Sequence, residues 1–133
     1  MPDVSLNYFA ILVCAFLSVP LSIVWYSPLL FGKKWSFHTG VELKDRATTA
    51  AYVGGFLISL FTIYVLAHFV DYTVSTHFSQ GALTGLWIWL GFILTTHYLD
   101  TVHTRKSLKL LFIDMGYHLL FLILSGGILA IWQ

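Results

Sequence analysis

Four long stretches with almost no charged side chains constrain this chain more than any other feature of its sequence. Residues 4–32, 47–70 and 72–99 contain no Lys, Arg, Asp or Glu, and residues 110–132 contain only Asp114. A helix needs about 20 apolar residues to cross a bilayer, and each stretch can supply them. We therefore predict four membrane-spanning helices, at Tyr8–Tyr26, Ala47–Val70, Gln80–Asp100 and Leu110–Trp132.

The composition indicates that the lipid bilayer is the chain's main partner. Of its 133 residues, 58% are hydrophobic and 10% are charged, whereas a soluble domain carries about 25% charged residues. The predicted helices leave little chain over, so we expect one all-α, four-helix transmembrane domain over residues 1–133 with short connections. A net charge of +1 and basic residues confined to the membrane flanks give no indication of a nucleic-acid partner.

The basic residues predict how the chain is oriented. All seven fall in or beside the first and third connections: Lys33, Lys34, Lys44, Arg46, Arg105, Lys106 and Lys109. With four spans, these two connections lie on one side of the membrane, and the positive-inside rule assigns that side to the cytoplasm. We therefore expect both termini to face outward, together with the turn at residues 71–80.

The first connection is unusually apolar and aromatic. It contains Leu29, Phe31, Trp35 and Phe37 next to Lys33 and Lys34. Two interpretations stay open for it. The first is a short interfacial segment that lies on the inner leaflet, and the second is an ordinary tight connection with aromatic anchors.

Small residues predict where helices approach one another closely. Gly55 lies in a small-xxx-small stripe of the second helix, Gly81 and Gly85 form another in the third, and Gly126 thins the fourth. Such stripes let helix backbones pack in lipid. They also offer surfaces for self-association, so we expect a homo-oligomer.

Ionisable side chains lie inside the last two predicted helices. Asp114 and His118 are four residues apart in the fourth helix, and His97 and Asp100 are three apart in the third. Each pair therefore shares a helix face. The connection between the two helices is short, so we expect an antiparallel hairpin with His97 at the level of Asp114 and His118 about one turn deeper.

Three interpretations of this group stay open. A histidine could hydrogen-bond Asp114 and hold the hairpin together. The group could be a proton or ion path, since histidine titrates near neutral pH. It could also be a divalent-metal site with His97, Asp114 and His118 as candidate ligands. We add Tyr117, which lies beside His118, and His68, near the outer end of the second helix, to the candidate site.

No motif of an enzyme is visible. The sequence contains no GxSxG, no phosphate-binding glycine loop and no CxxC, so we expect neither an enzyme nor a cofactor. The leading hypothesis is an oligomeric channel or transporter-like protein with a polar intramembrane face, whose ion or small-molecule substrate is unidentified. The alternative is a structural or accessory membrane subunit, and a metal-binding intramembrane enzyme is a distant third.

Several stretches carry a resemblance to a known family. They are WYSPLLFGKKW at residues 25–35, LAHF at 66–69, the glycines 81, 85 and 91 before Phe92, and LFIDMGYHLLFLILSGGILAIW at 111–132. They resemble an uncharacterised family of bacterial membrane proteins, domain of unknown function seventeen-sixty-one. The residues that carry the pattern are Trp25, Tyr26, Ser27, Pro28, Gly32, Trp35, His68, Gly91, Gly116, Tyr117 and His118.

The resemblance covers nearly the whole chain and so implies a complete single-domain member of that family. It further implies a multi-pass protein of a bacterial cytoplasmic membrane. The family has no assigned activity, so the resemblance implies architecture and no chemistry. It raises His68 and His118 among the candidate residues, whereas His97 does not belong to the pattern.

Overall fold

The chain folds as helices and turns. The computed structural model describes residues 3–133; it is 80% helical, and no strand occurs in this range. The prediction of an all-α fold with four membrane-spanning helices is confirmed in this sense, because four helices are long and apolar enough to cross a membrane.

The four long helices follow the charge-free stretches. Their bounds are α1 at Tyr8–Trp25, α4 at Thr49–Tyr72, a continuous third span at Phe78–Thr104, and α7 at Leu108–Ile131. The third span consists of α5 at Phe78–Ile88, a π-helical segment η1 at Trp89–Leu94, and α6 at Thr95–Thr104. It extends four residues beyond its predicted end, because the polar residues after Asp100 continue the helix until Arg105 adopts a left-handed conformation with φ 55°.

Polar side chains fix where three of these helices begin. The side chain of Asn7 accepts a hydrogen bond from the Ala10 amide, and that of Thr48 accepts one from the Ala51 amide. Ser107 accepts a bond from the Lys109 amide at the start of α7. Each cap satisfies a backbone donor that the first helical turn leaves without a partner.

Two short helices fill the first connection, α2 at Gly32–Thr39 and α3 at Leu43–Arg46. The chain turns at residues 26–31, where the Gly32 amide donates to the Ser27 carbonyl. A side chain at position 32 would overlap the backbone carbonyl of Tyr26, so this turn requires glycine. The expected segment after the first span is thus helical, and its position on the membrane stays a prediction.

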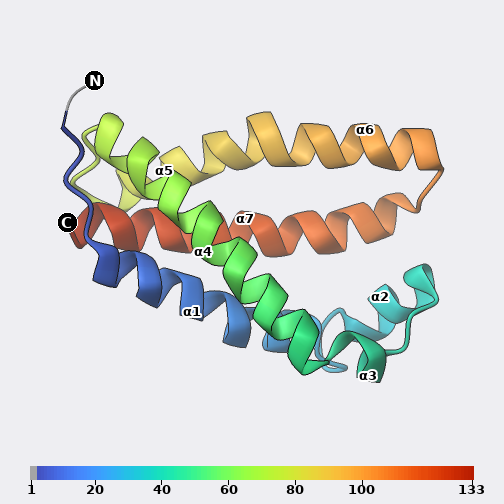
Figure 1. The fold of residues 1–133 in the computed structure, drawn as a ribbon. Coiled ribbons are helices and arrows are strands. Elements are labelled where there is room, and N and C mark those ends of the chain that lie inside the picture. The colour runs from blue at the N-terminus through green and yellow to red at the C-terminus, as the bar shows by residue number, and fades with distance from the viewer. Residues whose placement is uncertain (1–2) are drawn as a thin grey trace.

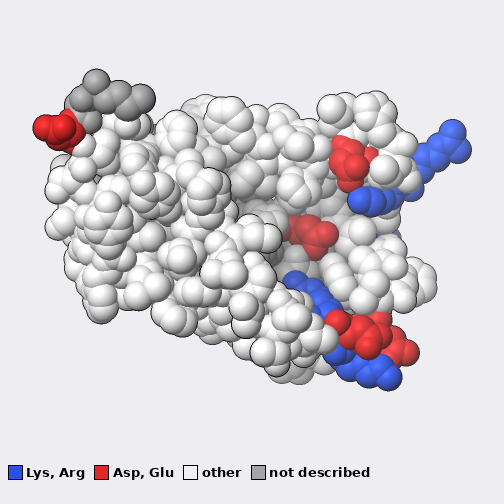
Figure 2. All heavy atoms as spheres, viewed as in Figure 1, with Lys and Arg blue, Asp and Glu red and all other residues white. Residues whose placement is uncertain are grey.

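The basic residues gather at one end of the molecule. Figure 1 shows the two termini and the α4–α5 connection at one end, and α2, α3 and the α6–α7 turn at the other. Lys and Arg side chains cluster at the second end in the space-filling view (Figure 2). We call it the basic end, and the opposite one the terminal end. The two basic connections therefore share an end, which is the arrangement that the orientation argument requires.

The packed core lies toward the terminal end and centres on α7. It joins α1, α4 and α7 through fully buried residues such as Cys14, Ile63, Leu66 and Leu122. Within the most apolar window of each span, 44% of α7 is buried but only 6% of the third span. The helix α7 is thus the centre of the fold, and the third span lies at its edge.

Candidate functional site

The third span and α7 lie close together only in the terminal half. There, side chains added at Gly81 and Gly85 of α5 would overlap the backbone of α7 at Gly126 and Leu122. Beyond η1 the two helices separate toward the basic end (Figure 1). Gly55 on α4 differs from these glycines, because nothing lies within 4 Å of a Cβ built there. It packs against no other helix of this chain.

A cavity fills the space where the hairpin opens. It has a volume of about 420 Å³ and lies between α2, α6 and α7. His97 and Asp100 line it from the third span, Asp114 lines it from α7, and Trp35 and Lys106 complete its mouth. Figure 2 shows charged atoms around a hollow at this end of the molecule. We call this space the hairpin cavity.

Asp114 is held by a tyrosine of the first span. The hydroxyl of Tyr26, at the end of α1, donates a hydrogen bond of 2.6 Å to its carboxyl group. The first of the three interpretations expected a histidine, and not a tyrosine, as the hydrogen-bond partner of Asp114.

Arg46 lies on the other side of Tyr26. Its guanidinium carbon is 3.6 Å from the centre of the Tyr26 ring and 5.1 Å from that of Trp35. An arginine over an aromatic face is stabilised by a cation–π interaction, which strengthens when the pair is shielded from water. Tyr26 therefore connects a carboxyl group on one side with a guanidinium group on the other.

A second cavity begins on the Arg46 side. Its volume is about 300 Å³, and it lies between α1, α4 and α7. Tyr26 and His118 line it, whereas Asp114 and His97 line the hairpin cavity. The rings of His97 and His118 are 6.0 Å apart between centres. Two contacts, Tyr26–Asp114 and His97–His118, thus bring together groups from the two cavities. We call the second space the α1–α4 cavity.

The remaining candidate residues fall into three situations. Tyr117 donates to the Ser18 carbonyl at 3.0 Å and packs against Tyr26, so it belongs to the same group. Asp100 forms an exposed ion pair with Lys106 at 2.8 Å. His68 donates to its own helix, at the Tyr64 carbonyl, near the terminal end. The structure therefore brings together all of the predicted polar residues except His68.

The residues that the structure describes, 3–133, contain no group of three or more His, Cys, Asp or Glu side chains placed to hold a metal ion. His97, Asp114 and His118 come close without forming such a group. His97 donates to the carbonyl of Ile93 in its own helix, and Asp114 accepts from Tyr26.

Sequence reasoning missed four residues that surround Asp114. Tyr26 and Arg46 were assigned to the membrane interface and to the basic flank. The indole of Trp25 donates to the Ile113 carbonyl, and that of Trp89 donates to the Met115 carbonyl, each at 2.9 Å. These two bonds connect the residues on either side of Asp114 to two different helices. The conspicuous Trp25–Tyr26 pair could have indicated half of this arrangement, but no pattern singled out Trp89.

Comparison with known proteins identifies a family and nothing closer. No curated protein and no solved structure matches the chain. A family model described as protein of unknown function (DUF1761) matches residues 9–130. The match covers all four long helices except the first residue of α1 and the last residue of α7, and it includes every residue of the site described above. The chain therefore belongs to the DUF1761 family.

Proposed function

We propose that this protein is a small channel or transporter-like membrane protein that handles a proton or a small cation at Asp114. One observation carries the proposal. Asp114 is a carboxyl group on a membrane-spanning helix, it lines a cavity of about 420 Å³, and its hydrogen-bond partner is a neutral hydroxyl. Ionisable groups at such depth are costly and commonly mark ion or substrate pathways.

The charges that line the hairpin cavity favour a positively charged species. Asp100 is offset by Lys106 at 2.8 Å, whereas no cationic side chain lies within 4 Å of Asp114 among the described residues. A proton or a small cation would therefore find its best binding site at Asp114. The rings of His97 and His118 lie beside it, 6.0 Å apart between centres, and an imidazole carries one nitrogen that can accept a proton and one that can donate it.

The route beyond Asp114 is closed in this structure. Toward the terminal end, α5 packs on α7 through Gly81 and Gly126, and the core of α1, α4 and α7 follows. A transported species would have to cross between the two cavities, where Tyr26 contacts Asp114 and His97 contacts His118. Separation of these two contacts is therefore the conformational step that we expect.

We infer that the chain resides in a bacterial cytoplasmic membrane with its basic end in the cytoplasm and both termini outside. The gathering of all Lys and Arg side chains at one end supports this orientation. We also infer a homo-oligomer. The third span is barely covered within one chain, and it exposes polar residues such as Thr96 and Tyr98, which suit a protein neighbour better than lipid.

The proposal is tested by flux in reconstituted vesicles. Purified protein is placed in liposomes that contain a pH-sensitive dye, and proton flux is followed after a pH step, with Na⁺ and K⁺ tested in parallel. We expect Asp114→Asn to reduce the flux to that of empty liposomes while the protein stays folded. Asp71→Asn, a matched change at the terminal end of α4, should leave the flux unchanged. Equal flux through the wild type and Asp114→Asn would refute the proposal.

A second candidate function is a structural or accessory subunit without any route. It is favoured by the hydrogen bonds that Trp25, Tyr26, Trp89 and Tyr117 make between α7 and its neighbours, since these bonds explain the polar residues by stability alone. In that case the wild type carries no flux of any tested ion, and the substitution of Asp114 changes only the unfolding midpoint.

A further inference from the structure

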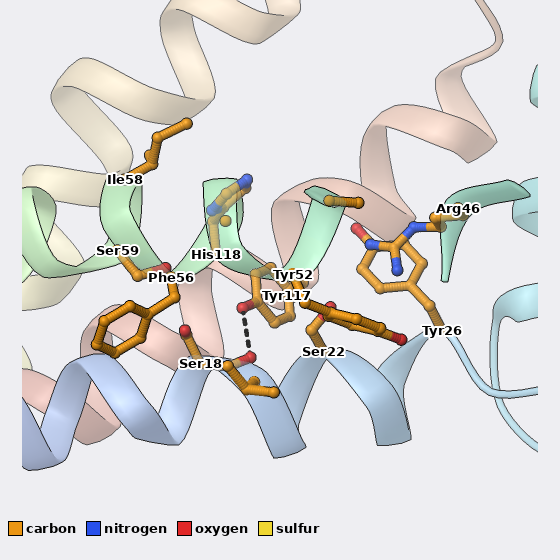
Figure 3. A pocket seen from close by; sticks show the side chains of 13 residues that line it. Ser18, Ser22, Tyr26, Arg46, Tyr52, Phe56, Ile58, Ser59, Tyr117 and His118 are labelled. Atoms are coloured by element: carbon orange, nitrogen blue, oxygen red, sulfur yellow. Dashed lines mark hydrogen bonds between the residues drawn. The ribbon is translucent and has the colours of Figure 1, made fainter. Parts of the chain in front are cut away.

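The α1–α4 cavity has a polar end and an apolar end. Figure 3 shows Arg46, Tyr26 and Tyr52 gathered at one end, with Phe56 and Ser59 toward the other. Arg46 precedes α4 at the basic end, whereas Ser59 lies nearly halfway along that helix. At 1.5 Å per residue the cavity reaches about 15 Å from the start of α4. It therefore runs from the membrane interface into the hydrocarbon region.

The polar end offers an unpaired positive charge. Arg46 is the one Lys, Arg, Asp or Glu residue that lines this cavity, and no carboxylate of residues 3–133 lies within 4 Å of its guanidinium. The rings of Tyr26 and Trp35 hold the guanidinium in place. Such a fixed and planar group is suited to bind phosphate with two parallel hydrogen bonds.

The polar end also continues toward the basic connection. A neighbouring cavity shares Ser22, Tyr26, Arg46 and Tyr52 with it and adds Lys44. The hydroxyl groups of Ser22 and Tyr52 lie at the junction of the two spaces and can donate hydrogen bonds to an anion. An anionic head group at Arg46 would thus have room and hydrogen-bond donors, whereas the charge of Lys44 is already offset by Glu42 at 3.0 Å.

The apolar end provides space for a hydrocarbon chain. Val19, Phe56 and Ile58 line it together with one hydroxyl group, that of Ser59, and the small residues Ala51 and Gly55 leave it open along one side of α4. A Cβ at Gly55 would meet no atom within 4 Å. A soluble anion could occupy the polar end, but it would leave this apolar surface uncovered.

We infer that the α1–α4 cavity binds an anionic phospholipid of the leaflet at the basic end. The phosphate contacts Arg46, and one acyl chain lies along α4 past Gly55. Basic pockets between membrane helices bind anionic head groups in this way, and the apolar end distinguishes a lipid from a free phosphate. The inference does not rest on ion conduction by Asp114, because it is argued from Arg46 and Gly55, which do not line the hairpin cavity.

Native mass spectrometry tests the inference. The protein is released from bilayers that contain equal amounts of dioleoyl phosphatidylglycerol and dioleoyl phosphatidylcholine, and the lipid that stays bound is counted. We expect the wild type to retain phosphatidylglycerol preferentially. Arg46→Gln should lower this preference about fivefold, the effect of one basic residue near an anionic lipid. Arg105→Gln removes the same charge from the same end, outside the cavity, and should change nothing.

Two further measurements distinguish a bound phospholipid from a free anion. Gly55→Leu fills the apolar end without changing charge and should also reduce the retained phosphatidylglycerol. Glycerol phosphate, which has the same anionic group but no chains, should neither bind nor displace the lipid. Equal preference in the wild type and Arg46→Gln, or an equal loss in Arg105→Gln, would overturn the inference. So would displacement by glycerol phosphate, which would identify a site for a free anion.

Discussion

The third span and α7 run side by side along the molecule, yet the two halves of this hairpin differ in how they meet. In the terminal half, Gly81 and Gly85 bring α5 so close to α7 that no side chain would fit between the backbones. In the basic half, beyond η1, α6 leaves α7, and a cavity of about 420 Å³ separates them. One half is closed by small residues, and the other is open and lined by ionisable ones.

The difference shows how a small membrane protein can contain both a scaffold and a polar site. Lipid gives helices no hydrophobic reason to associate, so close packing must hold them together. The closed half provides that packing. The open half can then place Asp114 and His97 beside a cavity, while hydrogen bonds from Trp25, Tyr26 and Trp89 attach α7 to its neighbours.

The largest loss of stability should follow from a substitution in the closed half. In Gly81→Ala, the new methyl group would overlap the carbonyl of Gly126 and approach the Ala130 side chain. Overpacking of this kind costs about 1–3 kcal/mol, which a thermal unfolding curve in detergent would detect. Gly91→Ala in the same span is the control, since nothing lies within 4 Å of its new Cβ. Equal shifts in the two variants would contradict a closed terminal half.

A smaller loss should follow from Tyr26→Phe in the open half. The variant keeps the ring under Arg46 but removes the 2.6 Å hydrogen bond to Asp114. Bonds to carboxyl groups contribute about 1.5 kcal/mol, so the unfolding midpoint should fall by less than in Gly81→Ala. Tyr8→Phe, the same change at a side chain that is 68% exposed, should have no effect. An unchanged midpoint in Tyr26→Phe would show that Asp114 has another partner.

The hydrogen bond of Trp89, where the closed half meets the open half, should contribute less to stability than that of Tyr26. In Trp89→Phe, the first residue of η1 loses its bond to the Met115 carbonyl. Side-chain hydrogen bonds in membranes average about 0.6 kcal/mol. Trp87→Phe makes the same replacement at a side chain that is 62% exposed. The difference between the unfolding midpoints of these two variants measures the contribution of the hydrogen bond. Equal midpoints would show that the bond does not stabilise the protein.

The smallest effect is expected deep in the closed half. The hydroxyl of Ser125 is fully buried and has no hydrogen-bond partner among residues 3–133. Removal of an unsatisfied polar atom is neutral or slightly stabilising. The unfolding midpoint of Ser125→Ala should therefore be equal to that of the wild type or slightly higher. A clear fall would mean that the hydroxyl group does have a hydrogen-bond partner in the folded protein.

The scaffold was largely predictable from the sequence, because its causes are local. Charge-free stretches mark the spans, and Gly81 and Gly85 are one helical turn apart on the face that meets α7. The seven basic residues fall in two connections, which the fold places at the same end. Length, hydropathy and small-residue spacing act within one segment and can be recognised there.

The surroundings of Asp114 were not predictable, because their causes are tertiary. Tyr26 lies 88 positions away from Asp114 along the chain, and Trp89 contacts α7 where the third span changes to π-helical geometry. The sequence predicted an antiparallel hairpin but not the separation of its two helices beyond η1. Residues 86–90 after Gly85 are all larger than glycine, and a Cβ at Gly91 would meet no atom within 4 Å, so the close contact is not sustained. The spacing of residues along a helix predicts which side chains share a face. It does not predict which residues of another helix contact that face.

Water access to position 114 is the most direct test of the contrast between the two halves. In a Cys14→Ala background, Asp114→Cys and Ser125→Cys are each exposed to a small, membrane-impermeant thiol reagent in sealed vesicles of known orientation. The account predicts rapid labelling of Asp114→Cys when the reagent reaches the basic end, none from the opposite side, and no labelling of Ser125→Cys from either. An unreactive cysteine at position 114 in folded protein, or equal labelling at position 125, would contradict it.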